Sequence, residues 1–222
     1  MHKWFVSEEF DGASIAAADF LARHIEASIQ QKGVCHVALP GGNTPAHCLG
    51  YLAEKSLSWN QINWYLGDER CYPSGHTDRN DVMLDKNLWS QIPTANIHRI
   101  PAELGAEQAA KLYREIVNSI DYFDIIFLGM GEDGHTASLF PGNEALHDTH
   151  SVIPVYNSPK EPADRVSLSI STIKKAKCRM VLTGGVAKSD VIRRVKSGES
   201  LPINCLGDIN WFVDKAALTE SV

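Results

Sequence analysis

Short apolar runs typical of buried strands alternate with helical patterns along nearly the whole 222-residue sequence. Val34–Leu39, Ile62–Leu66 and Phe123–Leu128 are the clearest strand patterns, and Gly12–Gln31 and Ala106–Ile120 carry apolar residues at helical spacing. Strands that alternate with helices form a mainly parallel sheet with helices on both faces. Because no repeat, low-complexity tract or linker divides the sequence, we expect a single α/β domain over residues 1–222.

The remaining segments fit the same alternation. Thr44 as N-cap and Pro45 at the first helical position predict a helix that runs toward Lys55. A short helical stretch is expected after the glycine-rich turn that follows Leu128, and a helix through Val191 and Val195 should end near Gly198. The other predicted elements are a helix over Asn80–Trp89 and strands at Ile97–Ile100, Val152–Val155, Val166–Ile170, Arg179–Leu182 and Trp211–Val213.

Charge and composition limit the possible partners and compartments. The net charge is -6, so no broad basic surface is available to neutralise a nucleic-acid backbone, and an anionic ligand must be held by a local cluster of basic groups. The five cysteines are scattered without a C-x-x-C pair, which favours reduced thiols. Acidic residues, not an apolar stretch, follow Met1–Trp4, so we expect no signal peptide, and no apolar run reaches membrane length. We therefore expect a cytoplasmic protein without a nucleic-acid or membrane partner.

Three glycine-rich junctions lie where a predicted strand leads toward a helix: Gly41–Pro45, Gly129–His135 and Thr183–Lys188. A fourth strand ends in Asp68-Glu69-Arg70. In a parallel sheet these junctions meet at the carboxyl edge, where ligands bind and helix N-termini offer N–H groups to anions. One glycine junction alone is as readily a simple turn. Three of them that carry Thr44, His135 and Lys188 predict a binding site.

Phe123–Leu128, the most apolar of the predicted strands, leads to Asp133-Gly134-His135. Histidine is the usual general base near neutral pH, and a nearby carboxylate fixes its tautomer. By residue type alone, His135 is more often a capping or packing residue. Its position in a glycine-rich turn beyond a central strand favours the catalytic interpretation.

Other catalytic patterns are absent or weak. Gly129–Gly134 formally matches the G-x-G-x-x-G dinucleotide motif, but Glu132 and Asp133 would place negative charge where a pyrophosphate should lie. No G-x-S-x-G, H-E-x-x-H or cysteine cluster occurs, so we expect neither metal nor organic cofactor. Three further candidates are assigned no role, since His147 and His150 fall in an expected surface loop and Cys71 lacks a neighbouring base.

Four blocks of sequence resemble 6-phosphogluconolactonases. They are Pro40–Pro45 (PGGNTP), Gly67–Pro73 (GDERCYP), Leu128–Gly142 (LGMGEDGHTASLFPG) and Gly184–Lys188 with the helix that follows. The third block is the most specific, and together they extend over most of the chain. The resemblance implies a single-domain, Rossmann-like parallel sheet flanked by helices, as in glucosamine-6-phosphate deaminases and ribose-5-phosphate isomerases. It also implies hydrolysis of 6-phospho-D-glucono-1,5-lactone to 6-phosphogluconate in the oxidative pentose phosphate pathway.

The same resemblance implies roles for individual residues. His135 would be the base, and Asp133 would orient it, a role that the D-x-H spacing also supports. Arg70 and Lys188 would hold the substrate and its phosphate, and Arg165 is a further candidate contact. The sequence leaves open which of these three cations touches the phosphate. The remaining implied substrate-binding residues are Gly41, Gly42, Asn43, Thr44 and Asp68.

Two other functions compete with this one. Deaminases and isomerases of the same superfamily share the glycine-rich junctions, but deaminases read D-E-Y and N-G-H-I-A-F-N-E-P where this chain has Asp68–Arg70 and Asp133–Pro141. The glutamate of that motif is absent here. A non-catalytic sugar-phosphate sensor is the second alternative, although the chain carries no helix-turn-helix pattern or basic extension. We expect a monomer or a homodimer.

Overall fold

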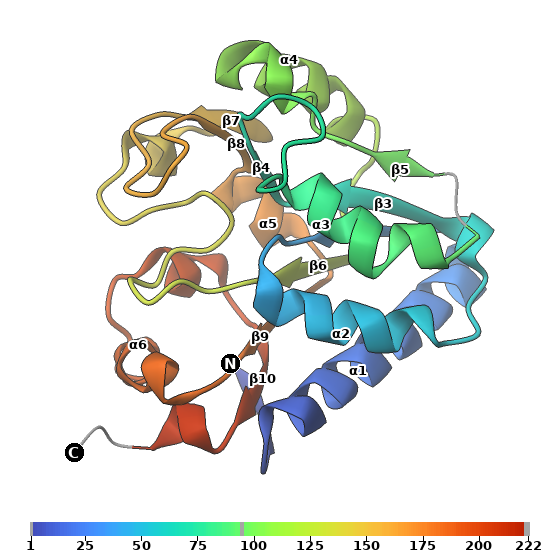
Figure 1. Ribbon diagram of the computed structural model, residues 1–222, viewed down its shortest axis with the longest axis vertical. Helices are drawn as coiled ribbons and strands as arrows, with labels where there is room; N and C mark the ends of the chain where they lie inside the picture. The colour runs from blue at the N-terminus through green and yellow to red at the C-terminus, as the bar shows by residue number, and fades with distance from the viewer. Residues whose placement is uncertain (1, 94–95, 220–222) are drawn as a thin grey trace.

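The computed structural model describes residues 2–93 and 96–219, and a seven-stranded sheet crosses its centre (Figure 1). The strand order is β1-β10-β9-β6-β2-β3-β5, and every neighbouring pair is parallel. The strands are β1 (Lys3–Ser7), β2 (Cys35–Leu39), β3 (Ile62–Leu66), β5 (Ile97–His98), β6 (Ile125–Leu128), β9 (Cys178–Thr183) and β10 (Asn210–Asp214). This arrangement confirms the predicted α/β fold with a mainly parallel sheet.

A second sheet of three antiparallel strands was not predicted. It has the order β4-β8-β7, formed by β4 (Asp68–Arg70), β8 (Arg165–Leu168) and β7 (Val152–Val155). Gly67 joins β3 to β4, and its N–H donates to Leu39 O while its carbonyl accepts from the N–H of Leu168. Asp68-Glu69-Arg70 has no apolar strand pattern. It forms a strand only because it pairs with β8, which is distant in the sequence.

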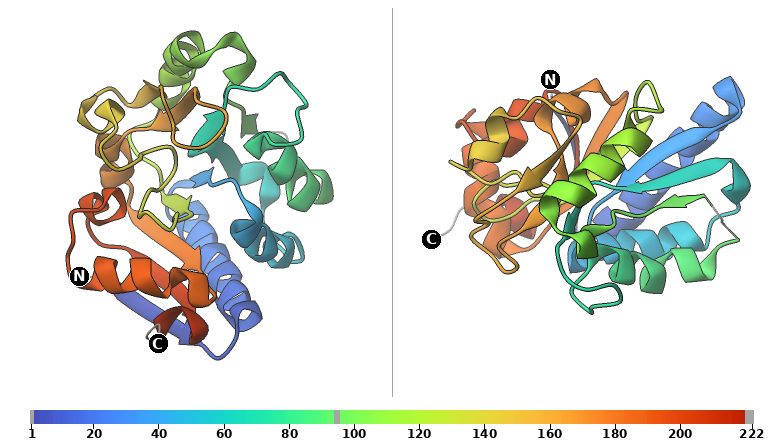
Figure 2. Two further views of the ribbon diagram at one scale, coloured as in Figure 1. Left: turned by 60° about the vertical axis from the view of Figure 1, so that its left-hand side comes forward. Right: turned by 90° about the horizontal axis from the view of Figure 1, so that it is seen from above.

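Three helices pack side by side, and a fourth lies against the small sheet. α1 (Phe10–Lys32) contacts α2 (Asn43–Ala53), which contacts α3 (Asn80–Asn87), while α4 (Ala106–Val117) lies beside β7 and β8 (Figures 1 and 2). None of the helices within residues 2–93 and 96–219 is long and apolar enough to cross a membrane. Two short helices, α5 (Ile170–Lys175) and α6 (Ser189–Lys196), and 3-10 turns at Trp59–Gln61, Trp89–Gln91, Ala102–Leu104, Glu144–His147, Val186–Lys188, Pro202–Leu206 and Ala216–Leu218 complete the fold.

Several predicted boundaries differ from the structure. Thr44 is not the N-cap, because Gly42, with φ 96°, turns the chain so that α2 already begins at Asn43. The helix expected after β6 is absent, since positive φ values at Gly134 (81°) and Ala137 (48°) keep that segment in turns. Strand β1 was missed because it is a sheet edge whose apolar residues are partly exposed.

Two more boundaries were wrong. The predicted strand Val166–Ile170 ends at Leu168, and Ser169 then caps α5 by accepting a hydrogen bond from the N–H of Thr172. The predicted helix over Asn80–Trp89 ends at Asn87, and a 3-10 turn at Trp89–Gln91 follows it.

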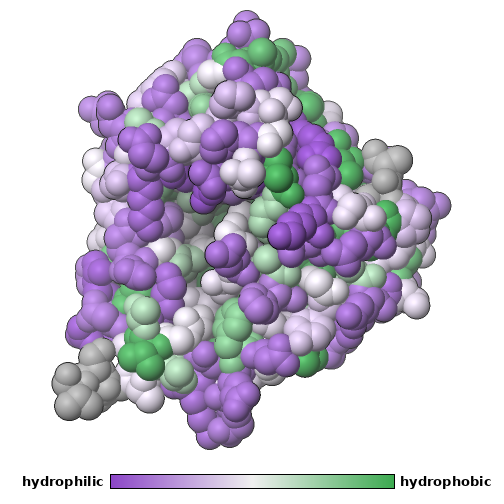
Figure 3. Space-filling model, viewed as in Figure 1, coloured by the Kyte–Doolittle hydropathy of each residue, from purple (hydrophilic) through white to green (hydrophobic). Residues whose placement is uncertain are grey.

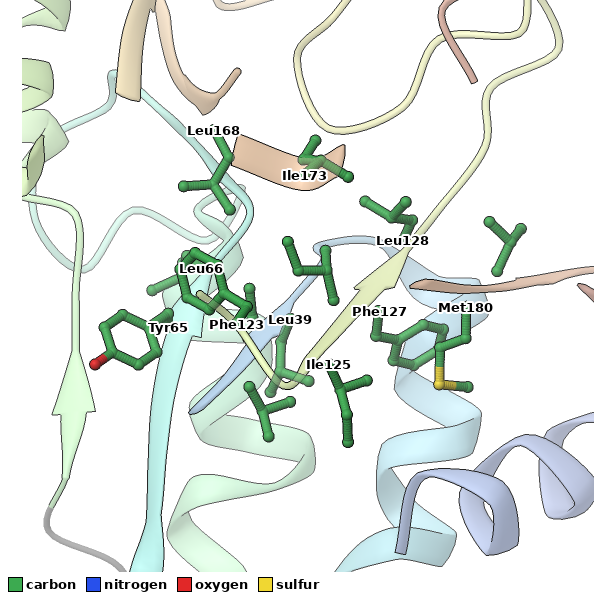
Figure 4. Close-up of a cluster of buried hydrophobic side chains, with 14 of the residues drawn as sticks. Leu39, Tyr65, Leu66, Phe123, Ile125, Phe127, Leu128, Leu168, Ile173 and Met180 are labelled. Carbon is green, nitrogen blue, oxygen red and sulfur yellow. The ribbon is translucent and has the colours of Figure 1, made fainter. Parts of the chain in front are cut away.

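The central strands are buried along most of their length and hold the core together. Figure 4 shows Leu39, Leu66, Phe127 and Met180 among the side chains that pack between neighbouring elements. Strand order reverses between β2 and β6, because the chain continues from β2 toward β3 on one side and places β6 on the other. Loops that leave such neighbours diverge, and the crevice between them is the usual ligand site of an open parallel sheet.

Candidate active site

A cavity of about 240 Å³ opens at this reversal point, beyond the carboxyl ends of four strands. The hollowed centre of the molecular face in Figure 3 has a largely hydrophilic rim. Every site residue predicted from the sequence lines the cavity except Asp133, which is hydrogen-bonded to His135. The nine predicted residues that line it are Gly41, Gly42, Asn43, Thr44, Asp68, Arg70, His135, Arg165 and Lys188. The structure therefore brings the separate sequence blocks to one place.

His135 and Asp133 form a short hydrogen-bonded pair at the end of β6. Nδ1 of His135 lies 2.5 Å from Oδ1 of Asp133, which also accepts from the His135 N–H at 3.2 Å. Burial lowers the pKa of His135, against the opposing effect of the Asp133 carboxylate. Burial would raise the pKa of Asp133, but the hydrogen bonds it accepts and the charge interaction with His135 together lower it. A neutral imidazole that donates from Nδ1 to a carboxylate keeps Nε2 as its basic nitrogen.

Gly131 makes room for this imidazole. A β-carbon at position 131 would lie 2.1 Å from both Nδ1 and Cε1 of His135 and 2.6 Å from Oδ1 of Asp133. Such distances are far below van der Waals contact, so any side chain at 131 must displace the ring. Gly131, the second glycine of the apparent dinucleotide motif, thus leaves the space that the His135 ring occupies.

We expect Gly131→Ala to lower kcat by about 10²-fold, because displacement of a catalytic group by about 1 Å has that effect. Steady-state kinetics would measure it, and circular dichroism would verify the fold. Gly50→Ala is the matched control, since a β-carbon there, within α2, meets nothing within 4 Å. Unchanged kcat in Gly131→Ala would contradict the assigned position of the imidazole.

Two arginines face each other across the small sheet beside the cavity. Arg70 of β4 pairs directly with Arg165 of β8. Like charges directly opposite one another are destabilising, which is tolerated where an anion can lie against both. Arg70 donates from Nη1 to Asp78 O at 2.7 Å, and its buried Nε has no partner within the described chain. Burial lowers the pKa of Arg165, with Arg70 adding to the effect.

Asp68 is buried at the floor of the cavity and is held by two neighbours. Ser138 Oγ donates to Oδ2 at 2.6 Å, and Asn80 Nδ2 donates to Oδ1 at 3.2 Å and to the Asp68 carbonyl at 2.8 Å. Asn80 also packs closely against the first glycine-rich loop. A β-carbon on Gly41 would lie 1.8 Å from Oδ1 of Asn80. Asn80 thus fixes Asp68 and the Gly41 loop relative to each other.

Lys188 reaches the cavity from the β9 junction. Its Nζ donates to Met130 O at 2.9 Å, which places the ammonium group beside the turn that carries His135. Burial lowers the pKa of Lys188, while Glu132 and Asp133 act in the opposite direction. The residue stands directly before α6, which begins at Ser189.

Sequence reasoning missed two polar residues of the cavity, Asn80 and Lys160. Asn80 was recognisable only as the start of a predicted helix, and Lys160 lies in a polar loop without a pattern. His147 and His150 are exposed, as expected, and burial raises the pKa of Cys71 to about 11. All five cysteines are unpaired. Within the described ranges, no three His, Cys, Asp or Glu side chains are arranged to hold a metal ion.

Comparison with known proteins identifies the family. The model for glucosamine-6-phosphate isomerases/6-phosphogluconolactonase matches residues 9–211. The chain belongs to this family. The 6-phosphogluconolactonase of Synechocystis sp. is 34% identical over 211 residues, which cover 87% of each chain. That of Haemophilus influenzae is 31% identical over 219 residues, covering 91% of this chain and 94% of the relative. The family resemblance seen in the sequence is confirmed.

Solved structures agree with this assignment. The crystal structure of 6-phosphogluconolactonase from Thermotoga maritima has a TM-score of 0.90 and 27% identity, and the match covers 97% of this chain and all of the other. A monomeric glucosamine-6-phosphate deaminase reaches a TM-score of 0.85 at 21% identity, covering 98% of this chain. At that identity the likeness to the deaminase shows only that the two proteins share a fold.

Proposed function

We propose that this protein hydrolyses 6-phospho-D-glucono-1,5-lactone to 6-phosphogluconate in the oxidative pentose phosphate pathway, with His135 as the base. The observation that carries the proposal is the His135–Asp133 pair in one cavity with Arg70, Arg165 and Lys188. A lactone is a reactive ester, so its hydrolysis requires an activated water, a site for the oxyanion and an anchor for the phosphate.

The chemistry follows from the order of proton transfers. Nε2 of His135 takes a proton from water as the water oxygen attacks C1, and a tetrahedral oxyanion forms. The C1–O bond to the ring then breaks, and His135 returns the proton to the leaving ring oxygen. The products are a hydroxyl group and a carboxylic acid that ionises in water. Asp133 remains ionised and holds the imidazole in the tautomer that leaves Nε2 free.

The phosphate and the oxyanion both require positive charge or N–H donors. Gly41 and Gly42 lead into α2, whose first N–H groups, beginning at Asn43, have no acceptor within the helix. Arg70 contributes its guanidinium group to the cavity, and Lys188 offers a point charge. These groups anchor the ring so that C1 lies within reach of His135.

The side chain beside His135 favours hydrolysis over deamination. Phe140 stands where the deaminase motif has glutamate, and its ring centroid lies 4.5 Å from that of His135. An aromatic ring supplies no carboxylate for the proton transfers of an amino sugar. The apolar contact instead contributes to the burial that keeps His135 neutral.

The direct test is to generate the lactone enzymatically and follow its decay with and without the protein, subtracting spontaneous hydrolysis. We expect rapid decay with the wild-type protein. Glucosamine 6-phosphate should release no ammonia, which separates the lactonase from a deaminase. If the protein binds 6-phosphogluconate without accelerating lactone decay, the sugar-phosphate sensor is favoured and the proposal is wrong.

The pH profile provides a second test. Because burial lowers the pKa of His135 below its usual value of about 6.5, the imidazole is neutral and basic throughout the neutral range. We expect kcat/KM to be constant near pH 7 and to fall, as the base becomes protonated, with a midpoint below about 6.5. Initial rates between about pH 5 and 8 would measure it. A midpoint above that value would contradict the buried, neutral imidazole.

A further inference from the structure

The loop between β7 and β8, residues 156–164, contributes Lys160 to the lining of the cavity, and hydrogen bonds from Arg165 hold the loop backbone. Figure 2 shows this loop beside the segment that follows β6. Arg165 donates from Nε to Pro162 O at 3.2 Å, and from Nη2 to the carbonyls of Lys160 and Glu161 at 3.0 Å each. Two of the three guanidinium nitrogens of Arg165 therefore hold the loop backbone in place.

Lys160 combines a fixed backbone with a side-chain charge that has no partner among the described residues. Its carbonyl accepts from Arg165 and from Ser158 Oγ, and its N–H lies 3.3 Å from the same hydroxyl oxygen. Lys160 also lines the cavity. Across residues 2–93 and 96–219, no acceptor or carboxylate lies within bonding distance of its Nζ. The ammonium group is therefore available to a ligand.

The free charge lies close to the other charged groups of the site. Lys160 is one of the charges that oppose protonation of Lys188, after the larger effect of burial. It acts in the same direction on His135. Among the described residues that line the cavity, two ammonium groups and an arginine pair face a single carboxylate, that of Asp68, and this excess of positive charge favours an anionic ligand. Because the chain has a net charge of -6, most of its surface is not basic, and the local excess of cations is a distinctive feature of the cavity.

We propose that Lys160 is a further substrate-binding residue, which contacts the phosphate group of the sugar phosphate together with Lys188. This inference rests on the proposed lactonase function. Arg165 positions the loop so that Lys160 reaches the phosphate, and a lysine suits this site because its long stem carries a point charge over the rim.

The experiment compares Lys160→Gln and Lys160→Arg with wild type and with Lys111→Gln, a matched control on the exposed face of α4. Steady-state kinetics would use the phosphorylated lactone and, in parallel, glucono-δ-lactone, which lacks the phosphate. Calorimetry would measure the binding of 6-phosphogluconate and of gluconate independently of turnover.

For Lys160→Gln we expect KM for the phosphorylated lactone and Kd for 6-phosphogluconate to rise about tenfold, with kcat nearly unchanged, because a charge-assisted hydrogen bond is lost. Lys160→Arg should retain most of the binding. Values for glucono-δ-lactone should not change. Equal losses with both lactones, or an unchanged Kd for 6-phosphogluconate, would overturn the role of Lys160.

The outcomes also separate this inference from the proposed function. If the wild-type protein binds 6-phosphogluconate but does not hydrolyse the lactone, the proposed function fails, and the effect of Lys160→Gln on Kd still decides the role of Lys160. Failure of the wild-type protein to bind 6-phosphogluconate would overturn both.

Discussion

Replacement of His135 by alanine is expected to lower kcat for lactone hydrolysis by about 10²–10⁴-fold, the usual contribution of a general acid–base residue. KM should change little, because the proposed phosphate-binding groups, Arg70, Lys188 and the first glycine-rich loop, are unaltered in this variant. The fold should survive, since the imidazole is only partly buried, with 17% of its side chain exposed. Steady-state kinetics, with thermal unfolding as a check on stability, would measure both effects.

The chain itself contains a matched control for this substitution. Asp148-Thr149-His150 repeats the spacing of Asp133-Gly134-His135, and Nδ1 of His150 lies 2.7 Å from Oδ1 of Asp148. That pair is at the surface, away from the cavity, and 60% of the His150 side chain is exposed. His150→Ala should therefore retain wild-type kinetics. Equal rates for His135→Ala and the wild-type protein would remove His135 from the mechanism.

The two Asp-x-His pairs show what the sequence could and could not distinguish. Both have the same local hydrogen bond, so spacing alone does not separate them. The position of His135 after the most apolar strand did separate them, because a buried strand must end at the sheet edge where ligands bind. The sequence also predicted the central strands. Strands buried on both faces are continuous apolar runs, which can be recognised without knowing their neighbours in the sheet.

The remaining features depend on contacts between distant segments. The three-stranded sheet unites β4 with β7 and β8, which lie some 80 to 100 residues further along the chain, so no local pattern reveals it. The pairing of Arg70 with Arg165 arises from that sheet. Asn80 became a site residue only because α3 begins against Asp68 and the Gly41 loop. Local propensity predicts elements, whereas these positions are set by tertiary packing.

Glu69, between two predicted site residues, was assigned no role from sequence, yet its carboxylate connects β4 with α3. The residue is fully buried. Its Oε1 accepts from the N–H groups of Arg70 and Asn80, and its Oε2 accepts from the N–H of Asp81, all at 2.8 Å. Nε of Arg79 lies 4.0 Å from Oε2. Burial raises the pKa of Glu69 to about 7 despite these donors, which reflects how completely water is excluded.

We expect Glu69→Ala to lower the free energy of unfolding by about 3–5 kcal/mol, because it leaves the N–H groups of Arg70, Asn80 and Asp81 without their acceptor. Urea unfolding at about pH 8, where the wild-type carboxylate is ionised in the folded and unfolded states, would measure the loss. Glu103→Ala is the control, since Glu103 contacts Arg79 at 2.9 Å but has 36% of its side chain exposed, and about 1 kcal/mol or less is expected. Equal losses in the two variants would show that Glu69 does not organise this region. Because Glu69 fixes the backbone of Arg70 and Asn80, any Glu69→Ala protein that folds should also show a raised KM, whereas Glu103→Ala should not.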